Sequence, residues 1–570
     1  MRENGNVLNR DPAADGRKSR FFVIACALLI FIKYLLVSQL PISPRPSYRT
    51  DDMLMVMMAR SIMAGKWLGG YSYANLMKGC FFPLFLSATH QSGISYLSAL
   101  DLLNSAAALY LTLSVRTVLR RRRWMLILFA VLLFNPINAS ELTFERVYRC
   151  SITSMQTLFL FGSVFAAYLD KKNRPGRQTL RAVFCGFVLW SIWNTREDAL
   201  WVVPFVLVAG IVMLAGRLKG QRKWYRIVCS VVLFLMPFLV LAGGNTAIAI
   251  INRNVYGLPV RNETEAGFGE LLSTMYSIKN REHIEHVSVS AEKLERMYAV
   301  SPTLKKIEPE LTKHLQQTDV GTDRVNNDGE VEDGWFMWCV KRAVETSEVG
   351  KTLPEADAFY RQAARELKEA IADPGNGFET QWVMPSPLIS PWQEGYEGKL
   401  PAYMVRAAEY MISYKEVSAA PRIVDSSVER MSFLFEGITG NASIHSEVEV
   451  VGQYRQIYID RADAVALVYR CLNPLAAILS MVLFIVHIVL ALIRRDREEI
   501  PWLLVAAGTG LSILVLLAGI SYTDMTAFDA IRYTYMGGGY SLTLAFEWII
   551  ILRSVNRVYD FLKRKRGVTG

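Results

Sequence analysis

Long apolar segments, separated by short polar and basic connections, dominate the pattern along the chain. A helix needs roughly 20 residues to cross about 30 Å of hydrocarbon. Ten runs reach or approach this length: 21–42, 94–119, 124–135, 148–169, 182–193, 200–214, 227–251, 471–493, 502–520 and 530–552. The runs at 124–135 and 182–193 are short, so each helix must extend into flanking residues or tilt within a bundle. The pattern predicts an all-α polytopic membrane protein with about ten transmembrane helices.

Basic residues cluster after every second run. They lie at 120–123, 171–181, 217–226, 494–497 and 563–566. Because Lys and Arg are enriched in cytoplasmic connections, these segments are predicted to be cytoplasmic, together with the tails 1–20 and 553–570. The alternate connections hold most of the acidic residues and are therefore predicted to lie outside the cytoplasmic membrane.

A polar segment, about 252–461, interrupts the membrane pattern and is long enough for a domain of its own. It separates a first membrane region, 21–251, with an outer loop at 43–93, from the last three runs at 462–552. Within it, Ser301-Pro302 starts one helix, and 331–348 and 353–373 form two more. Alternating residues at 446–459 predict a strand. The segment is predicted to be a large, mainly helical extracytoplasmic domain.

The outer loop 43–93 contains an amphipathic helix next to the first apolar run. Thr50 or Asp51 can cap it, its apolar positions fall largely on one face, and it ends at Gly65. Such a helix is expected to lie along the membrane surface. Its first turn would hold the two carboxylates, Asp51 and Asp52, at the head groups and facing water.

Charged side chains recur in four of the predicted outer connections, close to the apolar runs. They are Asp51, Asp52, Lys78, Glu141, Glu145, Arg146, Arg149, Arg196, Glu197, Asp198, Asp524, Asp529 and Arg532. Charges near hydrocarbon are costly unless they are paired or line a water-filled cavity. Their recurrence at one depth predicts a shared cavity. The alternative is a set of local ion pairs, such as Arg196 with Glu197 and Glu145 with Arg149.

Composition narrows the class of protein. The 570 residues are 52% apolar and 20% charged, which excludes both an ordinary soluble globule and a disordered chain. The net charge of +11 comes mostly from residues beside the apolar runs, and no basic stripe with interleaved aromatics indicates a nucleic-acid partner. The seven cysteines show no metal-ligand spacing.

These features together resemble the GT-C superfamily of membrane glycosyltransferases. The resemblance is carried by Asp51-Asp52, the helix after them, N-T-R-E-D-A-L-W-V-V-P at 194–204, Arg532-Tyr533 and the outer domain. The segment D-G-W-F-M-W-C-V-K-R-A-V at 333–344 looks like that of uncharacterised bacterial members. The resemblance implies a cell-envelope enzyme that moves a sugar, with inversion, from a polyprenyl-phosphate carrier to an extracytoplasmic glycan, lipid or protein acceptor.

The residue types are compatible with this chemistry. A carboxylate with a reference pKa of about 4 is ionised at neutral pH, so Asp51 or Asp52 can act as the general base. A leaving phosphate needs cations, for which the candidates are Lys78, Arg146, Arg196 and Arg532. The supporting polar residues are Glu141, Glu145, Arg149, Glu197, Asp198 and Tyr533. The aspartates could instead hold a divalent cation; no other cofactor is expected.

Two other classes of protein fit the same pattern. A transporter or flippase of lipid-linked sugars would use the cavity without chemistry. A non-enzymatic envelope protein would bind a partner through the outer domain. The two halves of the chain do not mirror one another, which disfavours transporters built from inverted repeats.

Overall fold

A computed structural model of the chain describes residues 12–169, 175–197, 199–316, 329–421, 428–444, 449–494 and 499–565. In these residues the regular structure is helical, and β pairing is limited to three isolated bridges. The all-α prediction is confirmed.

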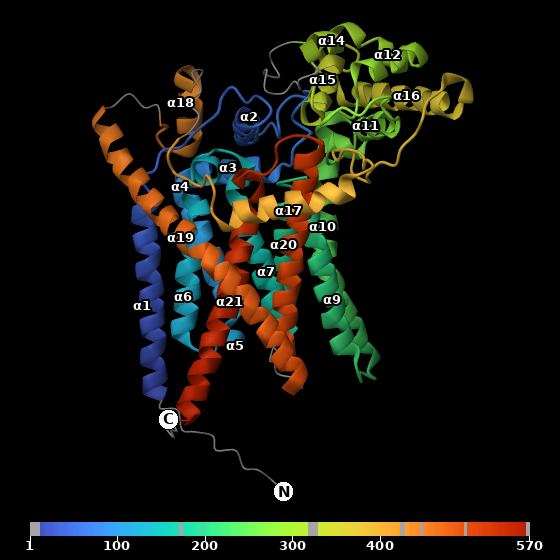
Figure 1. Cartoon of the computed structure of the whole chain (residues 1–570). Helices are drawn as coiled ribbons and strands as arrows, with labels where there is room; N and C mark the ends of the chain where they lie inside the picture. The colour runs from blue at the N-terminus through green and yellow to red at the C-terminus, as the bar shows by residue number, and fades with distance from the viewer. Residues whose placement is uncertain are drawn as a thin grey trace.

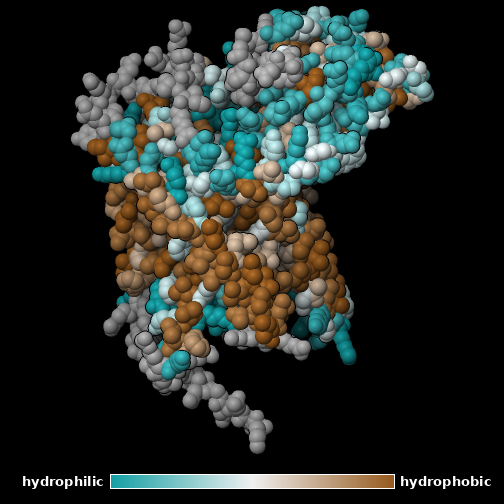
Figure 2. All heavy atoms as spheres, in the orientation of Figure 1, coloured by the Kyte–Doolittle hydropathy of each residue, from teal (hydrophilic) through white to brown (hydrophobic). Residues whose placement is uncertain are grey.

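Ten helices fill the ten predicted apolar positions and run side by side as a bundle (Figure 1). They are α1 (Pro12–Val37), α4 (Tyr96–Ser114), α6 (Arg122–Leu133), α7 (Thr153–Leu169), α8 (Pro175–Trp193), α9 (Val203–Leu218), α10 (Trp224–Tyr256), α19 (Glu449–Arg494), α20 (Ile500–Thr526) and α21 (Tyr533–Lys565). Within the described ranges, eight contain a stretch that is long and apolar enough to cross a membrane; α6 and α8, at the two short runs, do not. A hydrophobic band covers the bundle on the face shown in Figure 2. The chain is a multi-pass membrane protein.

The bundle has two distinct ends. The short helix α5 (Arg116–Leu119), the start of α1 and the last turns of α21 lie at one end, called here the terminal end because the first and last described helices begin and end there (Figure 1). Helices α2, α3 and α11–α18 lie at or near the other, called the domain end. This arrangement agrees with the alternation expected from the basic clusters. That the terminal end faces the cytoplasm stays a prediction.

The centre of the bundle is built around α7 and α21. Their apolar stretches are 72% and 83% buried, against 11% for α9 and 6% for α10. Small residues allow α7 and α21 to pack closely: a Cβ on Gly538 would lie 2.5 Å from the Thr157 hydroxyl oxygen. Thus α9 and α10 form the loosely covered edge of the bundle.

A helical domain with its own core sits on the domain end. It contains α11 (Gly267–Ser277), α12 (Ala291–Val300), α13 (Pro302–Lys305), α14 (Glu308–Gln316), α15 (Asp333–Thr346) and α16 (Leu353–Ala372). The helix expected after Ser301-Pro302 and those expected at 331–348 and 353–373 are confirmed. A capping box between Thr352 and Glu355 fixes the start of α16.

Two further helices, α17 (Tyr396–Ile412) and α18 (Val428–Thr439), lead back toward the bundle (Figure 1). The strand expected at 446–459 is wrong, because α19 begins at Glu449 and continues into the membrane region; residues 445–448 lie outside the described ranges. A short run of alternating residues does not separate strand from helix. The expected domain limits, 252 and 461, fall inside α10 and α19.

Candidate active site

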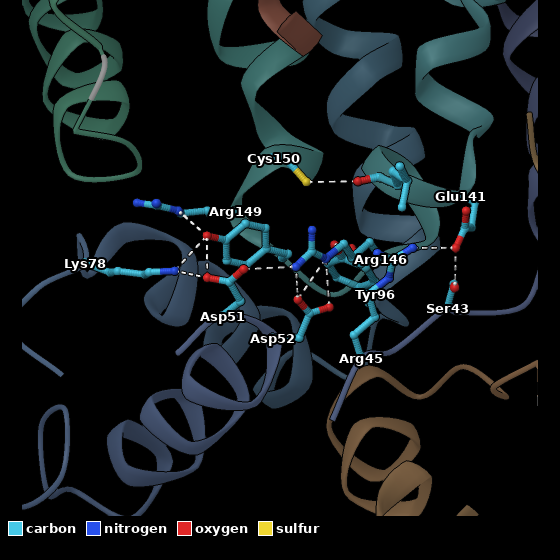
Figure 3. A network of polar contacts seen from close by, with 12 residues as sticks. Ser43, Arg45, Asp51, Asp52, Lys78, Tyr96, Glu141, Arg146, Arg149 and Cys150 are labelled. Atoms are coloured by element: carbon cyan, nitrogen blue, oxygen red, sulfur yellow. Dashed lines mark hydrogen bonds and ion pairs between the residues drawn. The ribbon is translucent and has the colours of Figure 1, made fainter. Parts of the chain in front are cut away.

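The aspartate pair lies at the start of α2 (Asp52–Met63), which packs on α3 (Phe81–Gln91). The expected helix is confirmed: it ends at Met63, and Gly65 has a φ of 72°. Asp51 occupies the N-cap position, but its side chain makes no capping hydrogen bond. The carboxylate turns instead toward cationic side chains from other segments (Figure 3).

Asp52 is fully buried and bound by Arg146. The Arg146 Nε lies 2.8 and 3.0 Å from the two carboxylate oxygens, and its Nη2 lies 2.5 Å from Oδ1. Burial raises the pKa of Asp52 above its usual value, although Arg146 opposes the shift. This side chain holds Arg146 in place and is closed to a ligand.

Asp51 is the accessible member of the pair, with 29% of its side chain exposed. It forms an ion pair with Lys78, accepts a hydrogen bond from the Tyr148 hydroxyl at 3.1 Å and lies 3.3 Å from Arg146 Nη2. Burial alone would raise the pKa of Asp51, but Lys78 and Arg146 outweigh it and hold the pKa well below the usual range. Asp51 is therefore an ionised carboxylate that a ligand can reach.

Tyr148 and Arg149 extend the network toward Glu197. The Tyr148 hydroxyl accepts hydrogen bonds from Lys78 Nζ at 2.8 Å and from Arg149 Nε at 2.9 Å. Arg149 Nη1 lies 2.6 and 2.5 Å from the two Glu197 oxygens. The alternative pairing of Arg149 with Glu145 is wrong. Sequence reasoning missed Tyr148, because an aromatic residue beside an apolar run is typical of a membrane interface.

Glu141 and Glu145 lie in a single turn of π-helix, Glu141–Glu145, just before Arg146. Glu141 accepts hydrogen bonds from Arg45 at 2.9 Å and Ser43 at 3.1 Å. Glu145 is fully buried, and in the described ranges neither of its carboxyl oxygens has a hydrogen-bond partner. Burial, with Glu141 and Asp463 nearby, raises the pKa of Glu145 well above its usual value. Glu145 is therefore an enclosed carboxyl group that a ligand does not reach.

Arg196 lines a pocket beside the network, connected to it through Arg149, whose Nη1 donates to the Thr195 carbonyl at 3.3 Å. The pocket has about 380 Å³ of space, counting the part open to the surroundings, and Thr195, Gln156 and Tyr535 also line it. Arg196 donates to the Thr534 carbonyl at 3.3 Å and lies 5.5 Å from the centre of the Tyr535 ring. A guanidinium is thus placed at a pocket that polar and apolar side chains line together.

The remaining candidates differ in position. The Arg532 side chain is about half exposed and lies 3.7 Å from Asp529. Its role in binding the donor phosphate stays a prediction. Tyr533 is buried and accepts a hydrogen bond from the Leu142 amide at 3.2 Å, so it supports the π-helical turn. Asp198 lies outside the described residues.

The helical domain α11–α16 contributes a side chain beside Lys78. The Trp338 ring, on α15, lies 5.6 Å from Lys78 Nζ. Glu263 ties the domain to the outer loop, since it accepts a hydrogen bond from Tyr71 at 3.0 Å and forms a buried ion pair with Lys341. The segment 333–344, noted for its resemblance, thus lies beside the predicted cation site.

The structure gathers six of the predicted side chains into one network. They are Asp51, Asp52, Lys78, Arg146, Arg149 and Glu197. Three carboxylates and three cations balance one another, although they come from four segments that are distant in the sequence. The cations can bind the oxygens of a phosphate, and one carboxylate faces outward to take a proton.

The donor set does not fit a divalent cation. Among the described residues, no group of three or more His, Cys, Asp or Glu side chains is arranged to hold a metal ion. Asp51 and Asp52 already contact Lys78 and Arg146, whose positive charges would repel a metal ion. The possible divalent cation stays an untested prediction.

Comparisons with known proteins find a structural similarity but no sequence family. No protein-family model and no curated protein matches the chain. The chain is similar to a solved structure of ArnT from Cupriavidus metallidurans in the apo state, with 13% identity and a TM-score of 0.31; the match covers 94% of this chain and 78% of ArnT. At this level of similarity no functional conclusion follows from the match, so function has to be inferred from the chain's own residues.

Proposed function

We propose that the chain is an integral-membrane glycosyltransferase, which moves a sugar from a polyprenyl-phosphate-linked donor to an extracytoplasmic acceptor. The observation that carries the proposal is the position of Asp51: a partly exposed carboxylate held among Lys78, Arg146 and Tyr148. The candidate general base thus lies next to the cations that would bind the phosphate, as transfer from a lipid phosphate requires. The GT-C resemblance of the sequence supports the same assignment.

Lys78 gives the site a way to couple donor binding to base strength. Without a ligand, its ammonium neutralises Asp51, which keeps the pKa of that carboxylate low and makes it a weak base. A donor phosphate competes with Asp51 for Lys78. Once Lys78 turns to the phosphate, the pKa of Asp51 rises toward its ordinary value, and the carboxylate becomes a better proton acceptor.

The transfer step then balances as a single displacement. The acceptor oxygen or nitrogen attacks the anomeric carbon, and the bond from that carbon to the phosphate oxygen breaks. The phosphate leaves with the electron pair, stabilised by Lys78, Arg146 and Arg149. The proton of the acceptor passes to Asp51, and the sugar inverts its configuration. Asp52 acts only as a positioning residue, through Arg146.

The pocket at Arg196 suits the sugar of the donor. Gln156 lines it and donates its amide to Ser191 and Thr195, at 3.1 and 2.9 Å. In the described part of the chain the Gln156 carbonyl oxygen is buried without a hydrogen-bond partner. A sugar hydroxyl can supply the missing donor. Gln156→Leu is therefore expected to raise KM for the donor more than it lowers kcat.

The test is release of polyprenyl phosphate by the full chain, reconstituted in vesicles with polyprenyl-phosphate-linked sugars. Asp51→Asn should abolish acceptor-dependent release, and Asp52→Asn should reduce it. The matched control Asp560→Asn, which alters the ion pair with Arg121 at the terminal end, should leave release unchanged. Full activity in Asp51→Asn excludes that residue as the base.

The same vesicles separate the two rival functions. A transporter or flippase would move the labelled donor across the membrane with no polyprenyl phosphate formed. A non-enzymatic envelope protein would do neither, and its aspartates would be dispensable. Activity after exhaustive chelation tests the predicted divalent cation, and loss that is restored by Mg²⁺ or Mn²⁺ would support it.

A further inference from the structure

A second pocket lies at the loosely covered edge of the bundle, away from Asp51. It is formed by α7, α8, α9 and α10 and has about 660 Å³ of space not filled by protein, counting the part open to the surroundings. Its lining comes from the last turns of α7, the first half of α8 and of α10, and almost the whole of α9. The end of α9 and the start of α10 lie toward the terminal end (Figure 1). Arg217, near the end of α9, thus places the polar end of the pocket toward the leaflet opposite the Asp51 network.

The lining changes from polar to apolar along the pocket. Arg181, Arg217 and Gln178 lie at the outer part of these helices, and the Arg217 guanidinium donates to Gln178 at 3.0 Å. Farther into the bundle the lining includes Val206 and Phe238. Val206 and Arg217 are separated by eleven steps along α9, roughly 16 Å of helix, which is about half of a 30 Å hydrocarbon layer. A group with a charged head and one apolar chain fits this gradient.

The charge of the surrounding segment specifies the head group. Five basic residues lie in the last turn of α9, the connection after it and the first turn of α10, namely Arg217, Lys219, Arg222, Lys223 and Arg226. Guanidinium groups bind phosphate oxygens through paired hydrogen bonds, and basic segments beside a membrane attract anionic lipids. The apolar stretches of α9 and α10 are mostly exposed, so they face lipid directly.

We infer that this pocket binds one anionic phospholipid of the leaflet at the terminal end. Its phosphate lies between Arg181 and Arg217, and one acyl chain follows the apolar lining toward Phe238. The bound lipid fills the space between α9–α10 and the rest of the bundle. This site is independent of the proposed transferase activity.

The test uses the purified, delipidated full chain in detergent, with phosphatidylglycerol and phosphatidylcholine as the probes. Native mass spectrometry gives the affinity for each lipid. The chain should prefer phosphatidylglycerol, and Arg181→Gln/Arg217→Gln should weaken its binding by about tenfold or more, as expected when charge-assisted bonds are lost. The control Arg20→Gln/Arg123→Gln removes the same charge from exposed positions outside both the pocket and the α9–α10 segment, and it should change the affinity less than about twofold.

A second variant tests the apolar half. Ala182 lines the pocket, and Ala182→Phe fills space while both guanidinium groups remain. It should weaken phosphatidylglycerol binding with little change in the thermal unfolding temperature. Equal affinity for phosphatidylglycerol and phosphatidylcholine overturns the inference. An equal loss of phosphatidylglycerol affinity in the pocket variant and in its control overturns it as well. Unchanged binding in Ala182→Phe overturns the placement of the acyl chain.

Discussion

Two buried ion networks lie at opposite ends of the bundle, and they differ in access. At the domain end, Asp51 keeps 29% of its side chain exposed. At the terminal end, Glu499 is 4% exposed; it lies 2.5 Å from Arg553 Nη2 and 3.6 Å from Arg557 Nη1, and accepts a hydrogen bond from Trp502. Both carboxylates have a pKa below the usual value, because their cationic partners outweigh burial.

The difference shows which network is suited to a ligand. The partners of Glu499 come from α20 and α21, and His487 of α19 lies 3.7 Å away, so the carboxylate connects three helices. The Asp51 network connects loops and leaves a carboxylate open beside a pocket. An enclosed ion network thus stabilises the packing of helices. A network with one exposed carboxylate can also take part in a reaction.

The largest expected effect is on activity. Asp51→Asn should lower kcat by about 10²- to 10⁴-fold, the usual contribution of a general base. Its unfolding temperature should change much less than that of Glu499→Gln, because a partly exposed group contributes less to stability. Turnover and thermal unfolding are measured on the same preparation. A large loss of stability with normal turnover would reverse the comparison.

Glu499→Gln should have the opposite effect. Removing the carboxylate leaves Arg553 buried without its counter-charge, which typically costs about 3–5 kcal/mol of unfolding free energy. The apparent unfolding temperature should fall, while activity per folded molecule stays unchanged. Asp560→Asn is the control, since its pair with Arg121 is about one third exposed and contributes roughly 1 kcal/mol or less. Equal shifts in the two variants would contradict an enclosed structural role.

The helices of the bundle could be predicted from the sequence alone. Apolar length and basic clusters predict the ten helix positions, because each depends on local composition. The Thr352–Glu355 capping box at the start of α16 is local as well, whereas Asp51, an expected cap of α2, makes no capping hydrogen bond. The strand at 446–459 was wrong because its short alternation is equally compatible with the first turns of α19, which tertiary context decides.

The partners within the site were less predictable. The sequence placed charges at a common depth, but whether Arg149 meets Glu197 or Glu145 depends on how the π-helical turn aims its side chains. Tyr148, Arg45 and Gln156 carry no charge pattern or motif that marks them. The Arg181–Arg217 pocket lies among four helices, α7 to α10, and depends on how they pack together, which no local pattern records.

Lys78 allows a finer test through pH. Asp51 must be ionised to accept a proton, and its low pKa in the free enzyme keeps kcat/KM constant as the pH falls toward the ordinary carboxyl range. Lys78→Gln removes the main cause of that low pKa, so kcat/KM should decline at a higher pH, nearer to about 4. The exposed Lys66→Gln is the control and should leave the profile unchanged. If kcat/KM of Lys78→Gln declines at the same pH as in the unchanged chain, Asp51 is not the group whose protonation causes the decline.

The smallest effects concern one hydrogen-bonding group in each network. Tyr148→Phe removes the hydroxyl that contacts Lys78, Arg149 and Asp51, so turnover should fall about tenfold, in keeping with the loss of a hydrogen bond to charged groups. Trp502→Phe removes a donor to Glu499 and should lower the unfolding temperature by a few degrees with turnover unchanged. Tyr148 is a positioning residue, so its loss should also shift the pH profile of kcat/KM, because Lys78 and Asp51 are no longer held together. A tyrosine that only fills space would leave that profile where it was, and Tyr148→Phe would then resemble Trp502→Phe.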